Sequence, residues 1–245
     1  MQIRVLFFGV VKDLAGRSSE TIELPEGARV EAVLRHYSQL VPRLEAILPS
    51  LALAVNQEYS SAESLLRPGD EVALLPPVSG GAQEARAARD EVRIVREPIV
   101  AQTAIAWMKQ PEDGAAVIFD GVVRNHTRGR RTLYLDYEAY EEMALKKMVA
   151  LAEEARSRFG VRQVALVHRL GRLKIGETSV LIVVASAHRG QAFEACRWII
   201  DTLKRTVPIW KKEYFEDGAV WAGGEPFPEE IQRAAGTAGE QPASK

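Results

Sequence analysis

Cysteine is nearly absent from this chain of 245 residues, in which Cys196 is the only one. One cysteine excludes a disulfide within the chain, and it excludes a metal site made of several thiolates. The four histidines include no pair spaced four residues apart, the spacing that places two ligands on one face of a helix. We therefore expect no structural metal.

Long apolar runs and a large excess of one charge are also missing. No apolar stretch reaches the roughly 20 residues that a membrane-spanning helix needs, and the net charge is -1. Residues 1–16 alternate like a strand and lack a cleavage site of small residues, so a signal peptide is not predicted. We expect a cytoplasmic protein that contacts neither a membrane nor nucleic acid.

The charges are divided unevenly along the chain, whose length suits one large domain or two of ordinary size. Residues 1–81 contain 7 Lys/Arg and 10 Asp/Glu, whereas the remainder contains 25 and 23. The front part is therefore acidic and the back part slightly basic, a difference that favours attraction between them.

Residues 1–81 predict a small domain with the element order β-β-α-β-β. Alternating apolar and β-branched residues indicate strands within 2–11, 18–24, 51–60 and 71–77, the first two paired as a hairpin. Helical spacing of Val30, Val33 and Tyr37 predicts a helix that Pro42 ends or kinks. A sheet folded over one helix is typical of a β-grasp, or ubiquitin-like, domain.

The predicted domain ends in the pair Gly80-Gly81, and no strand follows for ten residues, so a simple turn is disfavoured. Two residues without side chains form a tail that fits a narrow tunnel and leaves the terminal carbonyl open to attack. Residues 82–91 are charged and Ala-rich, and they are predicted to be a linker with only a weak helical pattern.

A second domain of α/β type is predicted for residues 92–245, with a tail composition from about residue 225. Strands are indicated within 91–99, 114–126, 132–140 and 163–190, and a final hairpin within 211–224. Helices are indicated within 100–110, 141–160 and 191–207, with Gly160 as a C-cap.

Cationic and polar side chains gather where these predicted elements end. The three groups are Arg124, His126, Arg128, Arg130 and Arg131; His188 and Arg189; and Lys204, Arg205, Lys211 and Lys212. Junctions between strands and helices commonly present ligand-binding groups, and a helix that begins after His188 favours an anion. The groups indicate a pocket for a phosphorylated or otherwise anionic small molecule, although solvated surface charges are the alternative for any single residue.

Other reactive residues are better explained by packing. His168 alternates with apolar neighbours, which is typical of a structural histidine, and Cys196 falls on an apolar helical stripe as a buried thiol. Trp198 and Trp210 are interpreted as packing groups.

Long ordered motifs carry a family resemblance that covers nearly the whole chain. The segments MQIRVLFFGVVKDLAG, AVNQEY and LRPGDEVALLPPVSGG resemble the small sulfur-carrier subunit of molybdopterin synthase. The segments FDGVVRNHTRG, LYLDYEAYEEMA, HRLGRLKIGE and VASAHRGQAFEACRWIIDTLKRTVPIWKKE resemble its large catalytic subunit. The linker and the last twenty or so residues lie outside the resemblance.

The resemblance implies an α+β protein, in which a β-grasp domain precedes an α/β hammerhead domain that forms a homodimer. It implies that a partner enzyme adenylates the small subunit's terminal glycine, here Gly81, and converts it to a thiocarboxylate. Two sulfurs then pass to cyclic pyranopterin monophosphate, which becomes the dithiolene of molybdopterin, and no cofactor is bound.

The resemblance also assigns residues to this sulfurtransferase reaction. Lys204 and Lys211 match the catalytic lysines, and Gly81 matches the sulfur carrier. Phosphate or pterin binding is expected from Arg124, His126, His188, Arg189 and Phe119, some of them contributed by a neighbouring subunit.

One feature departs from the family pattern, because Gly81 is bonded to Ala82 and has no free carboxylate. A protease that cuts between Gly81 and Ala82 would release the tail, and this is the interpretation we favour. The alternative is an uncut fusion whose front domain is only a scaffold or binding module, while a separate carrier delivers sulfur.

Two functions of other classes are also considered. A ubiquitin-like tag fused to a ligand-binding domain would not need Lys204 and Lys211. An RNA-binding protein that uses residues 124–131 would be expected to have a strongly basic domain with stacking aromatics, which this sequence lacks.

Overall fold

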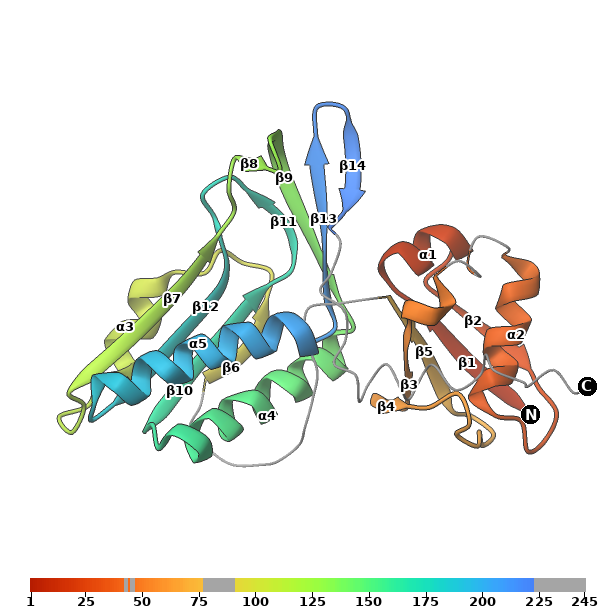
Figure 1. Ribbon diagram of the computed structural model, residues 1–245, viewed down its shortest axis with the longest axis horizontal. Coiled ribbons are helices and arrows are strands. Elements are labelled where there is room, and N and C mark those ends of the chain that lie inside the picture. Colours follow the sequence, from red (N-terminus) through yellow and green to blue (C-terminus); the bar gives the residue numbers. More distant parts are fainter. Residues whose placement is uncertain (42–43, 45–46, 77–90, 223–245) are drawn as a thin grey trace, which may run out of the picture. The chain divides into compact units, whose positions relative to one another are not determined.

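The computed structural model describes residues 1–41, 44, 47–76 and 91–222, which fall into two separate compact units. The predicted tail at Gly80-Gly81, the linker up to Asp90 and the chain beyond residue 222 lie outside the described residues. Among the helices that are described, none is long and apolar enough to cross a membrane. Figure 1 shows the elements of both units.

The first unit is a five-stranded mixed sheet that packs against helix α2 (Figure 1). The strand order is β2-β1-β5-β3-β4, and β1 runs parallel to β5. Its elements are β1 (Gln2–Phe7), α1 (Gly9–Ala15), β2 (Ser19–Glu23), α2 (Val30–Leu40), η2 (Leu48–Ser50), β3 (Ala52–Val55), β4 (Glu58–Ser60) and β5 (Glu71–Leu75). This arrangement confirms the β-grasp fold.

The core of this unit follows from the period-2 and period-3.6 patterns of the sequence. Ile3, Val5 and Phe7 alternate along β1 and meet the buried face of α2. The rings of Phe7 and Tyr37 pack edge to face, with their centroids 4.9 Å apart.

One prediction for this unit is wrong in detail. Strands β1 and β2 do pair antiparallel, but helix α1 connects them instead of a tight hairpin. The apolar run continues past Phe7 into α1, so the sequence pattern does not show where the strand ends and the helix begins. Gly9 begins α1 at a φ of 50°, a left-handed conformation that glycine adopts readily.

Within residues 91–222, the second unit contains two sheets and three helices. Figure 1 labels these elements. The first sheet has the order β6-β10-β12-β7, and the second has the order β11-β9-β13-β14 with β8 beside β9. The strands are β6 (Glu91–Val95), β7 (Ala115–Val122), β8 (His126–Thr127), β9 (Arg130–Ala139), β10 (Gln163–Arg169), β11 (Gly171–Lys174), β12 (Thr178–Ser186), β13 (Ile209–Phe215) and β14 (Gly218–Trp221). The helices are α3 (Ala101–Met108), α4 (Glu141–Phe159) and α5 (Arg189–Thr206).

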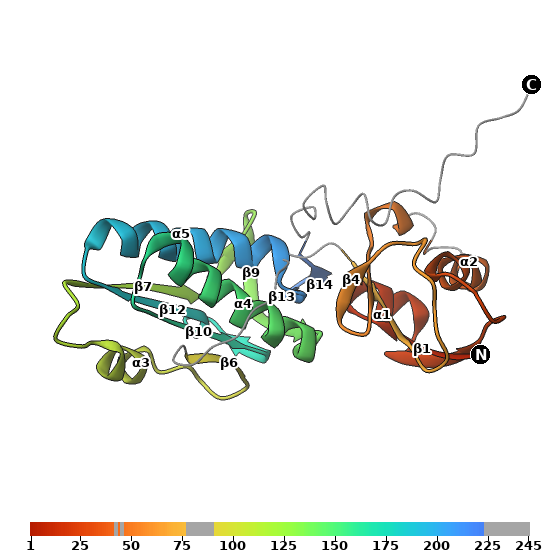
Figure 2. The same ribbon diagram turned by 90° about the horizontal axis from the view of Figure 1, so that it is seen from below.

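Helices cover both faces of the first sheet, as Figure 2 shows. Val164, Leu166 and Ile182 belong to the core beneath α4 and α5. Their strand neighbours Ala165 and Val183 belong to the smaller core beneath α3. Because β10 and β12 are apolar on both faces, they form the buried centre of an α/β layer, and the expected α/β character is confirmed.

Two details of the second unit differ from the sequence prediction. The region 163–190 contains three strands, because β11 leaves the first sheet and pairs with β9. Strand β6 begins at Glu91, within the segment assigned to the linker. The predicted C-cap of α4 is confirmed, since Gly160 is left-handed and its N–H donates to the carbonyl of Arg156.

Candidate functional site

Lys204 and Lys211 lie on either side of the short connection between α5 and β13. Lys204 is exposed in the last turn of α5, and Lys211 is the third residue of β13. The connection is fixed, because the N–H of Tyr140 donates to the carbonyl of Pro208 at 3.1 Å. The two lysines predicted to be catalytic are therefore presented from the same junction.

Lys211 has a carboxylate partner that the sequence analysis missed. Its Nζ lies 2.6 Å from Oε1 of Glu213, whose side chain is 4% exposed against 30% for that of Lys211. Both side chains point to the same face of β13 because they are two residues apart, and Leu135 lies opposite Glu213 on β9. The spacing Lys-x-Glu within a strand is the signal that would have revealed this pair.

Glu213 is incompletely satisfied within the described part of the chain. Its Oε2 atom is buried and has no hydrogen-bond partner there. A buried carboxylate oxygen without a donor is costly.

Arg124 and His126 follow β7 and are both exposed. The backbone around Arg124 is held on each side, because Val123 exchanges hydrogen bonds with the β11–β12 turn and the carbonyl of Asn125 accepts from Thr132. One ring nitrogen of His126, Nδ1, lies 3.1 Å from Oδ1 of Asn125. The fold thus presents Arg124 to solvent from a fixed backbone.

Two other arginines of the same predicted group are engaged elsewhere. Arg130 pairs with Asp217 and lies over the ring of Phe215, 3.8 Å from its centroid. Arg131 pairs with Glu216 at 3.1 Å. Both therefore fasten the β8–β9 hairpin to the β13–β14 turn, and Arg124 is the better candidate for an anion.

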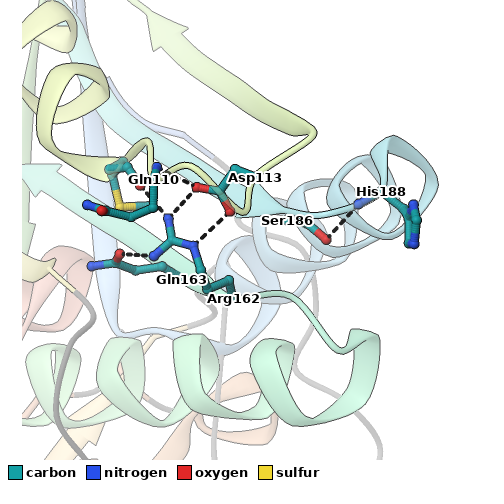
Figure 3. Close-up of polar contacts among 7 residues, drawn as sticks. Gln110, Asp113, Arg162, Gln163, Ser186 and His188 are labelled. Carbon is teal, nitrogen blue, oxygen red and sulfur yellow. Dashed lines mark hydrogen bonds and ion pairs between the residues drawn. The ribbon is translucent and has the colours of Figure 1, made fainter.

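His188 and Arg189 begin α5 and are exposed. His188 is the N-cap residue, but its side chain makes no capping hydrogen bond, and the first turn of α5 contains no acidic residue. In Figure 3 the His188 side chain points away from the neighbouring polar groups. The helix therefore offers its positive end together with two side chains that can carry positive charge.

The structure does not bring all predicted residues together within one chain. Lys204 comes fifteen positions after Arg189 in α5, a distance of about 22 Å along a helix axis. Phe119 lies between these ends, half-buried in β7 and packed on the core beneath α5. Lys204 and the His188–Arg189 pair therefore occupy opposite ends of α5, and Lys211 follows the Lys204 end.

The remaining sequence predictions concern residues with packing roles. Burial raises the pKa of the Cys196 thiol to about 11 and lowers the pKa of His168 to about 4. Nδ1 of His168 lies 3.0 Å from the carbonyl oxygen of Arg169. These environments agree with a core thiol and a structural histidine, and no cluster of metal-binding side chains occurs within the described ranges.

Comparisons with protein families divide the chain into the same two parts. Residues 5–81 match the ThiS family, a match that includes Gly81, and residues 94–206 match the family described as MoaE protein. Gly81 itself lies outside the described residues, so its role stays a prediction.

Similar proteins cover the back part of the chain. The molybdopterin synthase catalytic subunit of Halalkalibacterium halodurans is 46% identical over 53% of this chain and 83% of its own length. That of Pyrococcus abyssi is 41% identical over 56% of this chain and 94% of its own length. A crystal structure of molybdopterin synthase from Staphylococcus aureus matches with a TM-score of 0.53 and 40% identity, over 56% of this chain and 99% of that one. The chain therefore belongs to the MoaE family of molybdopterin synthase catalytic subunits and carries a ThiS-family domain ahead of it.

Proposed function

We propose that this chain is a molybdopterin synthase that contains both the sulfur carrier and the catalytic part. Sulfur held as a thiocarboxylate on Gly81 is transferred to cyclic pyranopterin monophosphate to form the dithiolene of molybdopterin. The observation that carries the proposal is the order of the two matches, since a ThiS-family match ending at Gly81 precedes a MoaE-family match in one chain.

The proposed chemistry needs no resident cofactor, because the pterin is the substrate. A thiocarboxylate is ionised at neutral pH, and its sulfur attacks a substrate carbon without a helper base. The carbon–sulfur bond replaces a carbon–oxygen bond at that carbon, and the oxygen leaves with a proton. Water then cleaves the acyl–sulfur bond, and the carrier leaves with a carboxylate at Gly81. One carrier is used for each of the two sulfurs.

Lys204 and Lys211 act on the intermediates of this sulfurtransferase reaction. Lys204 moves a proton and stabilises developing negative charge, and Lys211 assists. Their common position at the α5–β13 junction supports a shared role. Glu213 holds the ammonium group of Lys211 by its 2.6 Å contact.

Phosphate binding is assigned to Arg124 and His126 together with His188 and Arg189 of a second copy of the chain. Within one copy, about 22 Å of helix α5 separates Arg189 from Lys204. This distance is too long for one small substrate to contact both. Phe119 lies between the two ends of α5 and supplies an apolar surface for the pterin.

Strand β7 is the interface that we propose for this homodimer. It is an edge strand of its sheet within the described chain, and it exposes Ile118 and Val122, which are 42% and 51% accessible (Figure 1). Pairing two β7 strands antiparallel about a twofold axis places the beginning of one beside the end of the other. Ala115 pairs with Ser186, near His188, and Val122 precedes Arg124, so the pairing joins His188 of one copy to Arg124 of the other.

The dimer is tested by analytical ultracentrifugation of the full chain. Ile118→Lys should yield monomers, because two ammonium groups would meet near the twofold axis. Leu145→Lys, at another exposed apolar position on α4, should leave the dimer intact. Dimers of Ile118→Lys as stable as those of the unaltered chain would exclude β7 as the interface.

The carrier role requires cleavage between Gly81 and Ala82, followed by activation of Gly81 by an adenylating and sulfurating enzyme. The alternative keeps the fusion intact as a scaffold and takes sulfur from a separate carrier protein. Intact-mass spectrometry of the protein purified from its native cells distinguishes the two. A fragment that ends at Gly81 with sulfur in place of oxygen supports the carrier role, whereas an active preparation of only full-length chain supports the alternative.

A further inference from the structure

Three loops meet at the end of the first sheet where α5 begins. They are residues 109–114 between α3 and β7, residues 160–162 between α4 and β10, and residues 187–188 between β12 and α5. Asp113 and Arg162 come from the first two of these loops and point toward each other in Figure 3.

Asp113 and Arg162 form a bidentate ion pair. Arg162 donates from Nε to Oδ1 of Asp113 at 2.7 Å and from Nη2 to Oδ2 at 2.5 Å. The Asp113 side chain is 4% exposed and that of Arg162 is 25% exposed. The guanidinium of Arg162 holds the pKa of the Asp113 carboxyl below its usual value, so the pair stays charged at neutral pH.

Each of the three side-chain nitrogens of Arg162 donates to an acceptor. Its Nη1 donates to the side chain of Gln163 at 2.7 Å, and its Nη2 also donates to the carbonyl of Met108. The guanidinium is therefore occupied and cannot grip an anion directly without breaking these bonds. A role in holding the surrounding backbone fits better than a role as a ligand.

The pair holds the last residues of β12 from both sides. Next to Asp113, the N–H of Gly114 donates to the carbonyl of Ser186 at 3.1 Å. On the other side, the N–H of Arg162 donates to the carbonyl of Ala185 at 3.0 Å. The fit is close, because a Cβ at Gly114 would lie 2.3 Å from the carbonyl oxygen of Ala187.

The clamped residues lead directly into the start of α5. Oγ of Ser186 accepts a hydrogen bond from the N–H of His188 at 3.4 Å and lies 3.5 Å from Oε1 of Gln191. A shift of Ser186 would therefore move the helix start and both His188 and Arg189. A displacement of about 1 Å in groups that position a substrate can cost about 100-fold in rate.

We propose that Asp113 and Arg162 are positioning residues for the anion site at His188 and Arg189. The ion pair holds the loops 109–114 and 160–162 together across the end of β12. The position of these loops determines where α5 begins. This inference rests on the proposed function, since the anion is taken to be the phosphate of the pterin substrate. A buried ion pair is weak evidence for added stability, and in some proteins such polar pairs serve to fix one geometry.

The test uses full-length Arg162→Lys and Asp113→Asn, because each retains similar volume but cannot make both parallel bonds. Isothermal titration calorimetry should show about tenfold weaker binding of cyclic pyranopterin monophosphate in both. Hydrogen exchange should become faster at residues 187–191 and stay unchanged at residues 203–206, the other end of α5. Arg96→Lys is the matched control, because Arg96 makes a bidentate pair with Glu141 away from the start of α5, and it should bind normally.

The results of these experiments test the positioning role and the proposed function separately. Unchanged exchange at residues 187–191 in both variants would overturn the positioning role. Faster exchange with unchanged affinity would show a purely structural pair and would also overturn it. If the unaltered chain does not bind the pterin, the proposed function fails, and so does the assignment of the anion, while the exchange data still decide whether the pair sets the start of α5.

Discussion

The ammonium group of Lys211 lies 2.6 Å from a carboxylate oxygen of Glu213, and the two residues come from the same face of one strand. The carboxylate is nearly inaccessible to water, whereas the ammonium group is partly exposed. The position of Lys211 therefore depends on a charge that is itself buried. The contribution of this pair to stability can therefore be measured separately from its contribution to catalysis.

Removing only one member of this pair should destabilise the protein. Lys211→Met leaves the Glu213 carboxylate without its cation, and we expect the free energy of unfolding to fall by about 3 kcal/mol. The double variant Lys211→Met/Glu213→Leu should recover most of that loss, because no buried charge remains. Urea denaturation measures the free energy of unfolding of both variants. Neither variant should catalyse sulfur transfer, because both lack Lys211.

Lys204 should matter for the reaction and little for stability. It is exposed in the last turn of α5, so Lys204→Ala should cost at most about 1 kcal/mol through the helix dipole. Sulfur transfer should fall by about 100-fold or more, the usual contribution of a proton-transfer group. Arg205→Ala is the control, because Arg205 is its exposed neighbour and donates to the carbonyl of Asp201; equal losses in the two variants would deny Lys204 a specific role.

Arg124 should bind substrate phosphate, whereas Arg130 should not. Losing a hydrogen bond to a charged group costs about 1.5–3 kcal/mol, so Arg124→Ala should weaken pterin binding by about 10- to 100-fold. Arg130→Ala removes a nearby arginine in β9 that is already paired with Asp217. Titration calorimetry that finds the same affinity loss in both variants would contradict this division.

His168 should make stability depend on pH. Burial lowers its pKa from 6.5 to about 4, so between these values the unfolded chain binds a proton that the folded chain does not. The free energy of unfolding should therefore decrease as the pH falls through this window, by up to about 1.4 kcal/mol per pH unit. His168→Gln should flatten the slope of the free energy of unfolding against pH.

Elements with a strong period could be predicted from the sequence. The limits of α5 follow from an apolar stripe that ends before Pro208, and the end of α4 follows from Gly160. Helix α1 was missed because its valines continue the apolar run of β1 and look like more strand. Short strands such as β8 contain too few residues to show any period.

The site could be predicted only in part. The chemical types of Arg124, Lys204 and Lys211 and their places at element ends were readable from local sequence. The pairing of Asp113 with Arg162 was not, because 49 residues separate them and neither lies in a motif. Sequence also could not show that Arg130 is used by Asp217, since that contact depends on how two hairpins meet.

The length of α5 has a genetic consequence. If His188 and Arg189 serve the lysines of another copy, a Lys204→Ala chain and an Arg189→Ala chain carry defects that complement each other. In a mixed dimer one site collects both defects and the other is fully intact. Co-expression of the two variant chains in equal amounts should then give about one quarter of the sites intact, whereas every site formed by either chain alone carries a defect.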